Sequence, residues 1–160
     1  MRKWQIYGVI MKWGRCSMLL RPEKSLLREK NQAIVVSKDK GAQREHRAIN
    51  PERKYDLRHY RLDGDLIKQT TCCDFLLVND TQQKAYFIEL KGGNIDDAVD
   101  QLEAAEKKCR AELAGYAFFY RIVCSKARTH KIQDTKIRKF KEKCGGRLKM
   151  KENSLVETLE

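Results

Sequence analysis

The stretch CDFLLVNDTQQKAYFIELKGG, residues 73–93, decides the fold that the sequence predicts. It contains two apolar runs, 74–79 and 85–91, and the polar segment NDTQQ between them. Apolar and aromatic runs of this length on either side of a short polar turn are typical of a β-hairpin. The sequence therefore predicts two antiparallel strands here, and the rest of the chain is interpreted around them.

Three charged residues lie at the ends of this predicted hairpin. Asp74 begins the first strand, and Glu89 and Lys91 end the second. Side chains alternate between the faces of a strand, so Glu89 and Lys91 share one face. The turn sets a register in which Asp74 lies level with them. A charge is costly to bury unless it is paired or binds something, so this convergence predicts either ion pairs or a metal site.

The segments after the hairpin alternate between helix and strand. Asn94 is suited to cap a helix that Gly115 ends. The run YAFFYRIVC, residues 116–124, is the strongest strand pattern in the chain and is expected to be central. A second helix is predicted over 133–144, followed by edge strands within 147–159. The first helix has one apolar face, formed by Ile95, Ala98, Val99, Leu102, Ala105, Cys109 and Leu113.

The segments before the hairpin are less regular. A short helix is expected after Pro22, a brief strand at 33–36, and a short helix around Glu45 that stops before Pro51. Residues 55–62 alternate as a strand, and the Asp-Gly-Asp turn after them predicts a hairpin whose return begins at DLIKQ. Together these elements predict an α/β domain with a central mixed β-sheet flanked by helices.

Two converging carboxylates suit a hard divalent cation such as Mg²⁺, or Mn²⁺ in its place. Asp74 and Glu89 are the candidate metal ligands, and the carbonyl oxygen of Leu90 is a further one. Such a metal activates a bound water and polarises a phosphoryl oxygen. The ammonium of Lys91 would then orient that water or offset developing negative charge. These are the groups that phosphodiester hydrolysis needs.

Asp74, a gap of fourteen residues and the sequence Glu-Leu-Lys at 89–91 resemble the PD-(D/E)XK nuclease superfamily, which has the restriction-endonuclease-like fold. The resemblance covers residues 42–125 and implies a core of helix, three strands, helix and strand. It implies Asp74 and Glu89 as metal ligands and Lys91 as the catalytic lysine. It also implies a polar residue on the next helix, for which Gln101 fits. Some members use an acid from an upstream helix, which would be Glu45 or, in reserve, Glu29.

The charge balance favours a polyanionic partner. The chain of 160 residues has 34 Lys and Arg against 22 Asp and Glu, a net charge of +12. Most of the excess is local, because residues 126–151 contain eleven Lys or Arg and only two acids. A solvated helix face or a phosphate-tracking surface explains this excess, and the lack of balancing acids favours the surface. The predicted nucleic-acid-binding residues are Arg58, Arg61, Lys136, Arg138, Lys139, Lys141 and Lys143.

The sequence thus predicts a single domain over 1–160. It comprises an N-terminal extension at 1–22 of unassigned structure, a nuclease-like core at 42–125, and a basic helix with edge strands at 126–160. The expected function is a metal-dependent endonuclease acting on DNA ahead of RNA, with a possible homodimer. A catalytically inactive nucleic-acid-binding module of the same fold is the alternative, followed by a protein that docks on an acidic partner. The six cysteines form no C-x-x-C pair, and no apolar run is long enough for a bilayer, so a cytoplasmic protein without a membrane partner is expected.

Overall fold

The computed structural model describes residues 18–93, 95, 97–125 and 135–160 and contains two mixed β-sheets and two α-helices. The smaller sheet has the order β1-β2-β8, and the larger has the order β3-β4-β5-β6-β7. The strands are β1 (Ile34–Lys38), β2 (Glu45–Ile49), β3 (Leu57–Arg61), β4 (Phe75–Asn79), β5 (Lys84–Lys91), β6 (Ala117–Cys124), β7 (Leu148–Glu152) and β8 (Ser154–Thr158). The helices are α1 (Ala98–Cys109) and α3 (Thr135–Lys143), with 3₁₀ turns at Pro22–Lys24 and Pro51–Arg53.

The larger sheet is built around the predicted hairpin. Strands β3, β4 and β5 pair antiparallel, whereas β5 with β6 and β6 with β7 pair parallel. Helix α1 makes the crossover from β5 to β6 that parallel neighbours require. The element order β3-β4-β5-α1-β6 is therefore three strands, a helix and a strand. Strand β6 lies between β5 and β7, so the expectation that 116–124 would form a central strand is confirmed.

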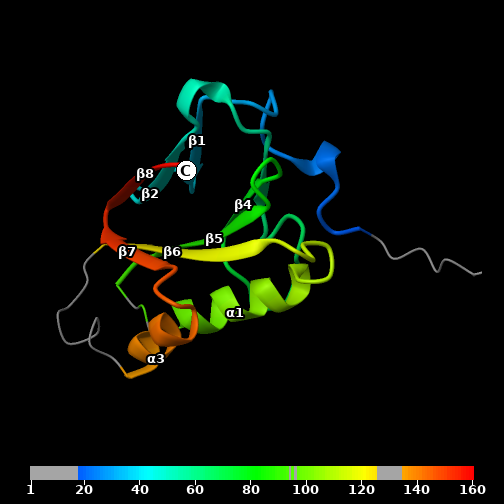
Figure 1. Cartoon of the computed structure of the whole chain (residues 1–160). Coiled ribbons are helices and arrows are strands. Elements are labelled where there is room, and N and C mark those ends of the chain that lie inside the picture. Colours follow the sequence, from blue (N-terminus) through cyan, green and yellow to red (C-terminus); the bar gives the residue numbers. More distant parts are fainter. Residues whose placement is uncertain (1–17, 94, 96, 126–134) are drawn as a thin grey trace, which may run out of the picture.

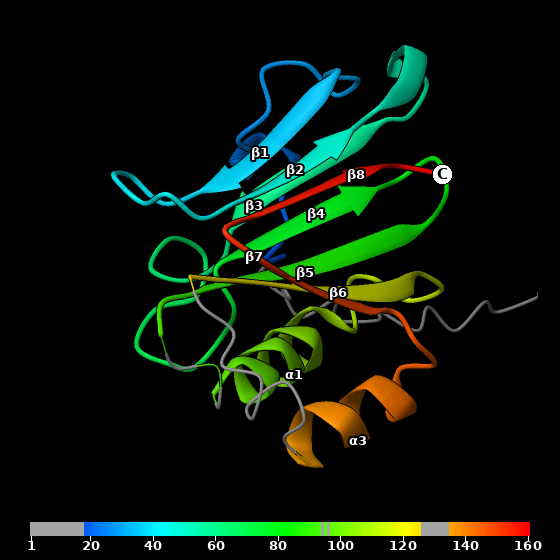
Figure 2. The same cartoon turned by 90° about the vertical axis from the view of Figure 1, so that its left-hand side faces the viewer.

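The molecule has three layers, which Figures 1 and 2 show from two sides. Helices α1 and α3 cover one face of the larger sheet, and the sheet β1-β2-β8 covers the other. The predicted mixed sheet is thus flanked by helices on one face, and a second sheet, which the sequence did not predict, covers the other. The strand β7 leads directly into β8 through Asn153, where a φ of 60° lets the chain turn from one sheet to the other.

Each face of β5 enters a separate core. The cluster under the helices contains Phe87 together with Leu102 of α1 and Phe140 of α3. The cluster between the two sheets contains Ile88 and Leu155. All seven residues of the predicted apolar face, from Ile95 to Leu113, are buried, so that prediction is confirmed. The two cores mean that any side chain on an inner position of β5 is taken out of water.

Three local predictions upstream of the hairpin are wrong. The segment around Glu45 and His46 is strand β2, because it pairs with β1 on one side and β8 on the other. The helix expected after Pro22 is limited to one 3₁₀ turn. The segment DLIKQ forms a turn with an isolated bridge between Asp63 and Ile67, and the return strand of the β3 hairpin is β4.

Some expectations fall outside the described residues, namely the extension up to residue 17, the Asn94 cap and the first residues of the second helix. The described part of that helix, α3, buries Ile137 and Phe140 as predicted. No helix within the described residues combines the length and the hydropathy that a membrane crossing requires.

Candidate functional site

The structure brings Asp74 and Glu89 together at one end of the β4-β5 pair. Phe75 lies opposite Ile88 in the antiparallel register, so one further step places Asp74 opposite Glu89 and on the same face. That face is the helix-covered one, because Phe87 belongs to the core under α1. The backbone N–H of Leu90 donates a 2.7 Å hydrogen bond to Oδ2 of Asp74. The pairing thus fixes the first predicted carboxylate against the strand that carries the second.

Glu89 is a buried acid with one oxygen left unbonded. Its side chain is 2% exposed, and its Oε1 lies 3.3 Å from Nζ of Lys91, whose side chain is 18% exposed. Its Oε2 is buried and has no hydrogen-bond partner in the described part of the chain. A buried polar atom without a partner is costly, and such atoms call for an explanation such as a bound ion or water. Lys91, which is partly exposed, therefore satisfies only one of the two carboxylate oxygens of Glu89.

Burial sets the protonation of both acids. Burial, reinforced by the negative charge of Asp74, raises the pKa of Glu89 to about 8, and Lys91 only partly opposes this. Burial likewise raises the pKa of Asp74 to about 6, against the stabilising N–H of Leu90. Near neutral pH the site is therefore short of positive charge. Glu89 is protonated there unless a bound cation takes the place of its proton. Perturbed pairs of this kind are enriched at functional sites.

Two further acids act on the site, and sequence reasoning missed both. The charges of Asp39 and Asp63 add to the rise in the pKa of Asp74. Asp39 follows β1, in the other sheet, and forms a 3.1 Å ion pair with Arg61 of β3. Its place in the sequence, inside the polar segment 39–44 between β1 and β2, gave no signal of this proximity. Only the packing of one sheet on the other reveals it.

The two predicted upstream acids have other partners. Glu45 lies on β2 and pairs with Arg47 and Lys38. Glu29 pairs with Arg53 in an exposed contact. Neither lies on an α-helix, which corrects the expectation of an upstream helical acid. The nuclease resemblance implies a helix before the three core strands. In the described residues, strands β1 and β2 lie there instead.

Gln101 lies on α1, the helix that packs on β5. Its side-chain Oε1 is buried and, like Oε2 of Glu89, finds no hydrogen-bond partner among the described residues. An amide with a free buried oxygen can accept a hydrogen bond from a water or ligand. The proposed supporting role of Gln101 stays a prediction, with this atom as its structural basis.

The donor set fits a hard cation better than a soft one. Two carboxylates and a backbone carbonyl are the oxygen ligands that Mg²⁺ and Mn²⁺ accept, usually with several waters. Across the described ranges, no group of three or more His, Cys, Asp or Glu side chains is arranged to hold a metal ion. A cation at this site would have Asp74, Glu89 and the carbonyl of Leu90 as its protein ligands and would keep much of its water.

The predicted nucleic-acid contacts differ in availability. The guanidinium of Arg58 donates at 2.7 Å to both oxygens of Asp80, and Arg61 is paired with Asp39. Lys136 and Lys143 hold α3 to α1 through Asp100 and Glu103. The remaining predicted cations of α3 are exposed and point away from the core: Arg138, Lys139 and Lys141.

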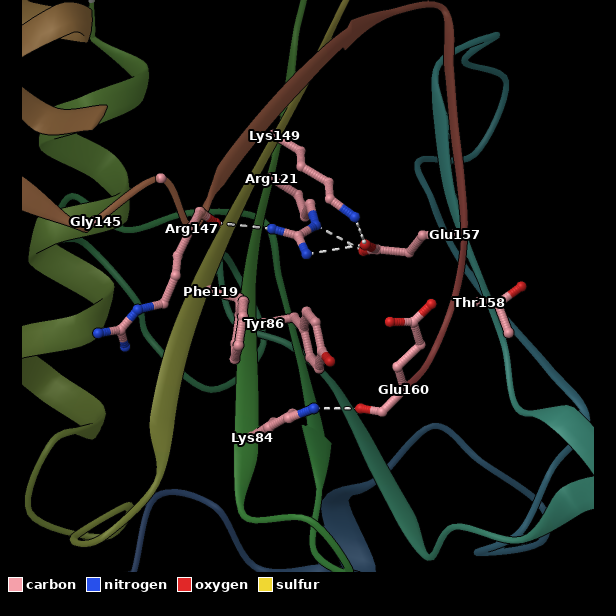
Figure 3. A pocket seen from close by; sticks show the side chains of 11 residues that line it. Lys84, Tyr86, Phe119, Arg121, Gly145, Arg147, Lys149, Glu157, Thr158 and Glu160 are labelled. Carbon is pink, nitrogen blue, oxygen red and sulfur yellow. Dashed lines mark hydrogen bonds and ion pairs between the residues drawn. The ribbon is translucent and has the colours of Figure 1, made fainter. Parts of the chain in front are cut away.

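A second cluster of buried charge, which the sequence did not predict, lies between the sheets (Figure 3). Arg121 of β6 donates to both oxygens of Glu157 on β8, at 2.6 and 2.9 Å. Nε2 of His46 lies 2.8 Å from Glu157, and Nζ of Lys149 lies 3.1 Å from it. Burial alone would raise the pKa of Glu157, but the hydrogen bonds from His46 and Arg121 hold it well below its usual range. This cluster ties β2, β6, β7 and β8 together.

Searches against protein-family models, curated proteins and solved structures found no match for this chain, so the site is characterised by its own geometry.

Proposed function

We propose that the protein is a metal-dependent nuclease that hydrolyses phosphodiester bonds, with DNA as the expected substrate and a restriction-endonuclease-like core. One observation carries the proposal: Glu89, buried opposite Asp74, keeps a free carboxylate oxygen while its only cationic partner is Lys91. A purely structural ion pair would be expected to satisfy both oxygens. A divalent cation that binds both acids would remove the deficit.

The chain's own residues have separate roles in this proposal. Asp74, Glu89 and the carbonyl of Leu90 would hold Mg²⁺ or Mn²⁺. When bound, the cation supplies an activated water and a polarised phosphoryl oxygen. Lys91 lies beside Glu89 and is partly exposed, which supports a role in which its ammonium would hold the attacking water or an oxygen of the scissile phosphate. Gln101 would accept a hydrogen bond from the side of α1.

The N–H of Leu90 has a positioning role. It is bonded to Oδ2 of Asp74, which leaves Oδ1 as the oxygen that can face a cation. The same bond fixes the carboxylate against β5, the strand that carries Glu89 and Lys91. Cation, water and phosphate would thus meet at the end of β5. The exposed cations of α3 would hold the nucleic-acid backbone through its phosphates.

An inactive nucleic-acid-binding module is the second candidate. It is favoured by the lack of a third carboxylate directed at the pair in the described residues. In that case Glu89 would keep its proton at neutral pH, and nucleic-acid binding would depend on salt but not on a divalent cation.

Cleavage assays distinguish the two. Purified protein is incubated with supercoiled plasmid, linear duplex, branched DNA, single-stranded DNA and RNA, each with Mg²⁺, Mn²⁺ or EDTA. Cleavage should require the metal and be lost in Glu89→Gln and Lys91→Ala. Removal of partners outside the ligand sphere of a metal costs about 10–100-fold, so loss of a ligand itself should reach at least about a hundredfold.

Asp56→Asn is the matched control for Asp74→Asn. Both aspartates lie just before a strand of the larger sheet, but Asp56 forms only an exposed ion pair with Lys30. The control should cleave like the wild type. Cleavage that persists in Glu89→Gln and Lys91→Ala would refute the site, and salt-sensitive retention of every substrate without cleavage would support the binding module.

A further inference from the structure

A cluster of aromatic and basic side chains lies at the end of the larger sheet opposite the acids. Strand β5 runs from Lys84 to Lys91, so its two ends are roughly 23 Å apart at about 3.3 Å per residue. The acids lie at the Lys91 end. At the Lys84 end, the first residue of β6, Ala117, is followed by two consecutive aromatic residues, Phe118 and Phe119, which are both only partly buried.

The two rings point to opposite faces of the sheet, as neighbours in a strand must. Phe118 lies on the helix side, where it meets the edge of Phe87 with ring centroids 5.5 Å apart. Phe119 lies on the side of the smaller sheet and stacks on Tyr86, with centroids 5.1 Å apart and planes 22° apart. Phe118 thus packs against Phe87, and Phe119 packs against Tyr86, but neither ring is enclosed by the core.

Each ring is accompanied by cations. The guanidinium of Arg110 lies 5.5 Å from the centroid of Phe118. Arg147 and Lys84 lie 6.0 and 5.9 Å from the centroid of Phe119. Figure 3 shows Arg147, Phe119 and Tyr86 side by side in that order. We name the five residues Lys84, Arg110, Phe118, Phe119 and Arg147 the β6 rim.

Two hollows open on either side of Arg147, which lines both. One, of about 460 Å³, lies between the sheets and contains Phe119 and Lys84. The other, of about 340 Å³, lies on the helix side and contains Phe118 and Arg110. Both volumes fall in the range of about 300–1,000 Å³ that is usual for small-ligand sites.

The three cations of the rim differ in availability. Arg110 is paired with Glu106, and Nζ of Lys84 donates to a main-chain oxygen of Glu160. Arg147 donates to the backbone carbonyl of Phe118 at 3.4 Å, and no carboxylate among the described residues forms an ion pair with it. Of the acids nearby, Glu157 is already held by Arg121 and Lys149, and Glu106 is held by Arg110. Arg147 is thus available to an incoming anion.

We propose that the β6 rim binds a single-stranded segment of nucleic acid, with unpaired bases against Phe118 and Phe119 and a phosphate on Arg147. Arg110 and Lys84 would take up neighbouring phosphates by exchanging their contacts with Glu106 and Glu160. The alternation of ring and cation matches the alternation of base and phosphate along a strand. Stacking on aromatic side chains beside cations is how proteins hold single strands without sequence preference. A duplex keeps its bases stacked inside and cannot present them to rings on both faces of a sheet.

This inference extends the proposed function but does not depend on cleavage. A nuclease with such a rim would hold an unpaired strand away from its acids, which suits substrates that join duplex and single-stranded regions. The rim equally serves a protein that binds and does not cut. Its test therefore uses EDTA and measures binding alone.

The experiment measures fluorescence anisotropy of a labelled ten-nucleotide single strand, with unlabelled single strand, duplex, mononucleotide and poly-glutamate as competitors. The double variant Phe118→Leu/Phe119→Leu keeps apolar bulk and should weaken single-strand binding about tenfold, with duplex binding little changed. Phe118→Tyr/Phe119→Tyr should bind within about twofold of the wild type. Thermal unfolding of each variant checks that it is folded.

Arg147→Gln should weaken single-strand binding more than Arg28→Gln, an exposed arginine of the loop before β1 that serves as the charge-matched control. This pair decides the question if the leucine variant fails to fold. The proposal is overturned if the folded leucine variant binds like the wild type, if Arg28→Gln and Arg147→Gln weaken binding equally, or if poly-glutamate competes as well as the strand. A mononucleotide that competes as well as the strand would assign the rim to free nucleotides instead.

Discussion

Glu89 and Glu157 are both acids in β-strands whose side chains are almost completely buried, and their environments are opposite. Glu157 receives two hydrogen bonds from Arg121 and further contacts from His46 and Lys149, and its pKa is lowered. Glu89 has one cation at 3.3 Å and one oxygen without a partner, and its pKa is raised to about 8.

The two environments indicate different roles for the two buried acids. A buried acid with every oxygen satisfied holds parts of the fold in register. A buried acid left short of positive charge destabilises the fold unless something binds there. The proposed nuclease site requires that Glu89 be short of positive charge. Replacing Glu89 and Glu157 each by glutamine tests whether the two acids differ in this way.

The largest effect is expected for Glu157→Gln. Removing one partner of a buried ion pair leaves the other charged and unpaired, so the free energy of unfolding should fall by about 3–5 kcal/mol. Chemical denaturation measures it, and Glu45→Gln, which breaks a partly exposed pair with Arg47 on the surface of the smaller sheet, is the control and should change little. A loss of stability for Glu157→Gln as small as that of the control would show that Glu157 does not stabilise the fold more than a surface acid.

The pH dependence of stability should have opposite signs at the two acids. The pKa of Glu89 rises from its ordinary value of 4.5 to about 8, so the unfolded chain releases this proton first and stability in EDTA falls between about pH 4.5 and 8. The slope attributable to Glu89 is at most about 1.4 kcal/mol per pH unit. The lowered pKa of Glu157 contributes stability above about 4.5 that is lost on acidification.

Denaturation of wild type and Glu89→Gln across pH 5–8 gives the contribution of Glu89 together with its coupling to Asp74, because groups distant from the pair cancel in the difference. The variant should lose less stability than the wild type as the pH rises. Adding Mg²⁺ should restore the stability that the wild type loses near pH 8 and should leave the stability of the variant unchanged. A wild-type curve parallel to that of Glu89→Gln would show that Glu89 ionises normally and would argue against a cation-deficient site.

Asp74 should show a smaller effect that depends on the substituent. Asp74→Ala removes the acceptor for the N–H of Leu90 and should cost about 1–3 kcal/mol of stability. Asp74→Asn keeps an oxygen as the acceptor and should cost less stability. Both variants should lose metal binding, which isothermal titration calorimetry measures. Equal stability of the two variants would mean that the hydrogen bond does not position the carboxylate.

The smallest effect is expected on the basic helix. Lys139 is exposed on α3, so Lys139→Gln should weaken duplex binding whatever the DNA sequence. The slope of the logarithm of the binding constant against the logarithm of the salt concentration should fall by about one. Lys54→Gln is the control, since Lys54 lies over the ring of the buried Tyr55 in another part of the molecule. An unchanged slope for Lys139→Gln would place the phosphate path elsewhere, with the β6 rim as the next candidate.

The local chemistry of the chain predicted its best-patterned elements. Strands β4 and β5, helix α1 and strand β6 follow from apolar periodicity and turn residues. The convergence of Asp74 and Glu89 followed as well, because a short hairpin turn fixes the register. The predictions failed where pairing with distant strands decides the structure. The segment around Glu45 and His46 carries polar and charged residues that fit a helix, but β1 and β8 make it a strand.

By itself, then, the sequence determined the hairpin, the residues at its end and the basic excess of the C-terminal segment, because these depend on neighbours in the chain. Only the tertiary structure decided that Glu89 is buried with a free oxygen, that Asp39 acts on Asp74, and that Arg147 lies beside Phe119. Each of these joins segments far apart in the chain. Burial and electrostatic contact depend on distance in space, which periodicity along a sequence does not encode.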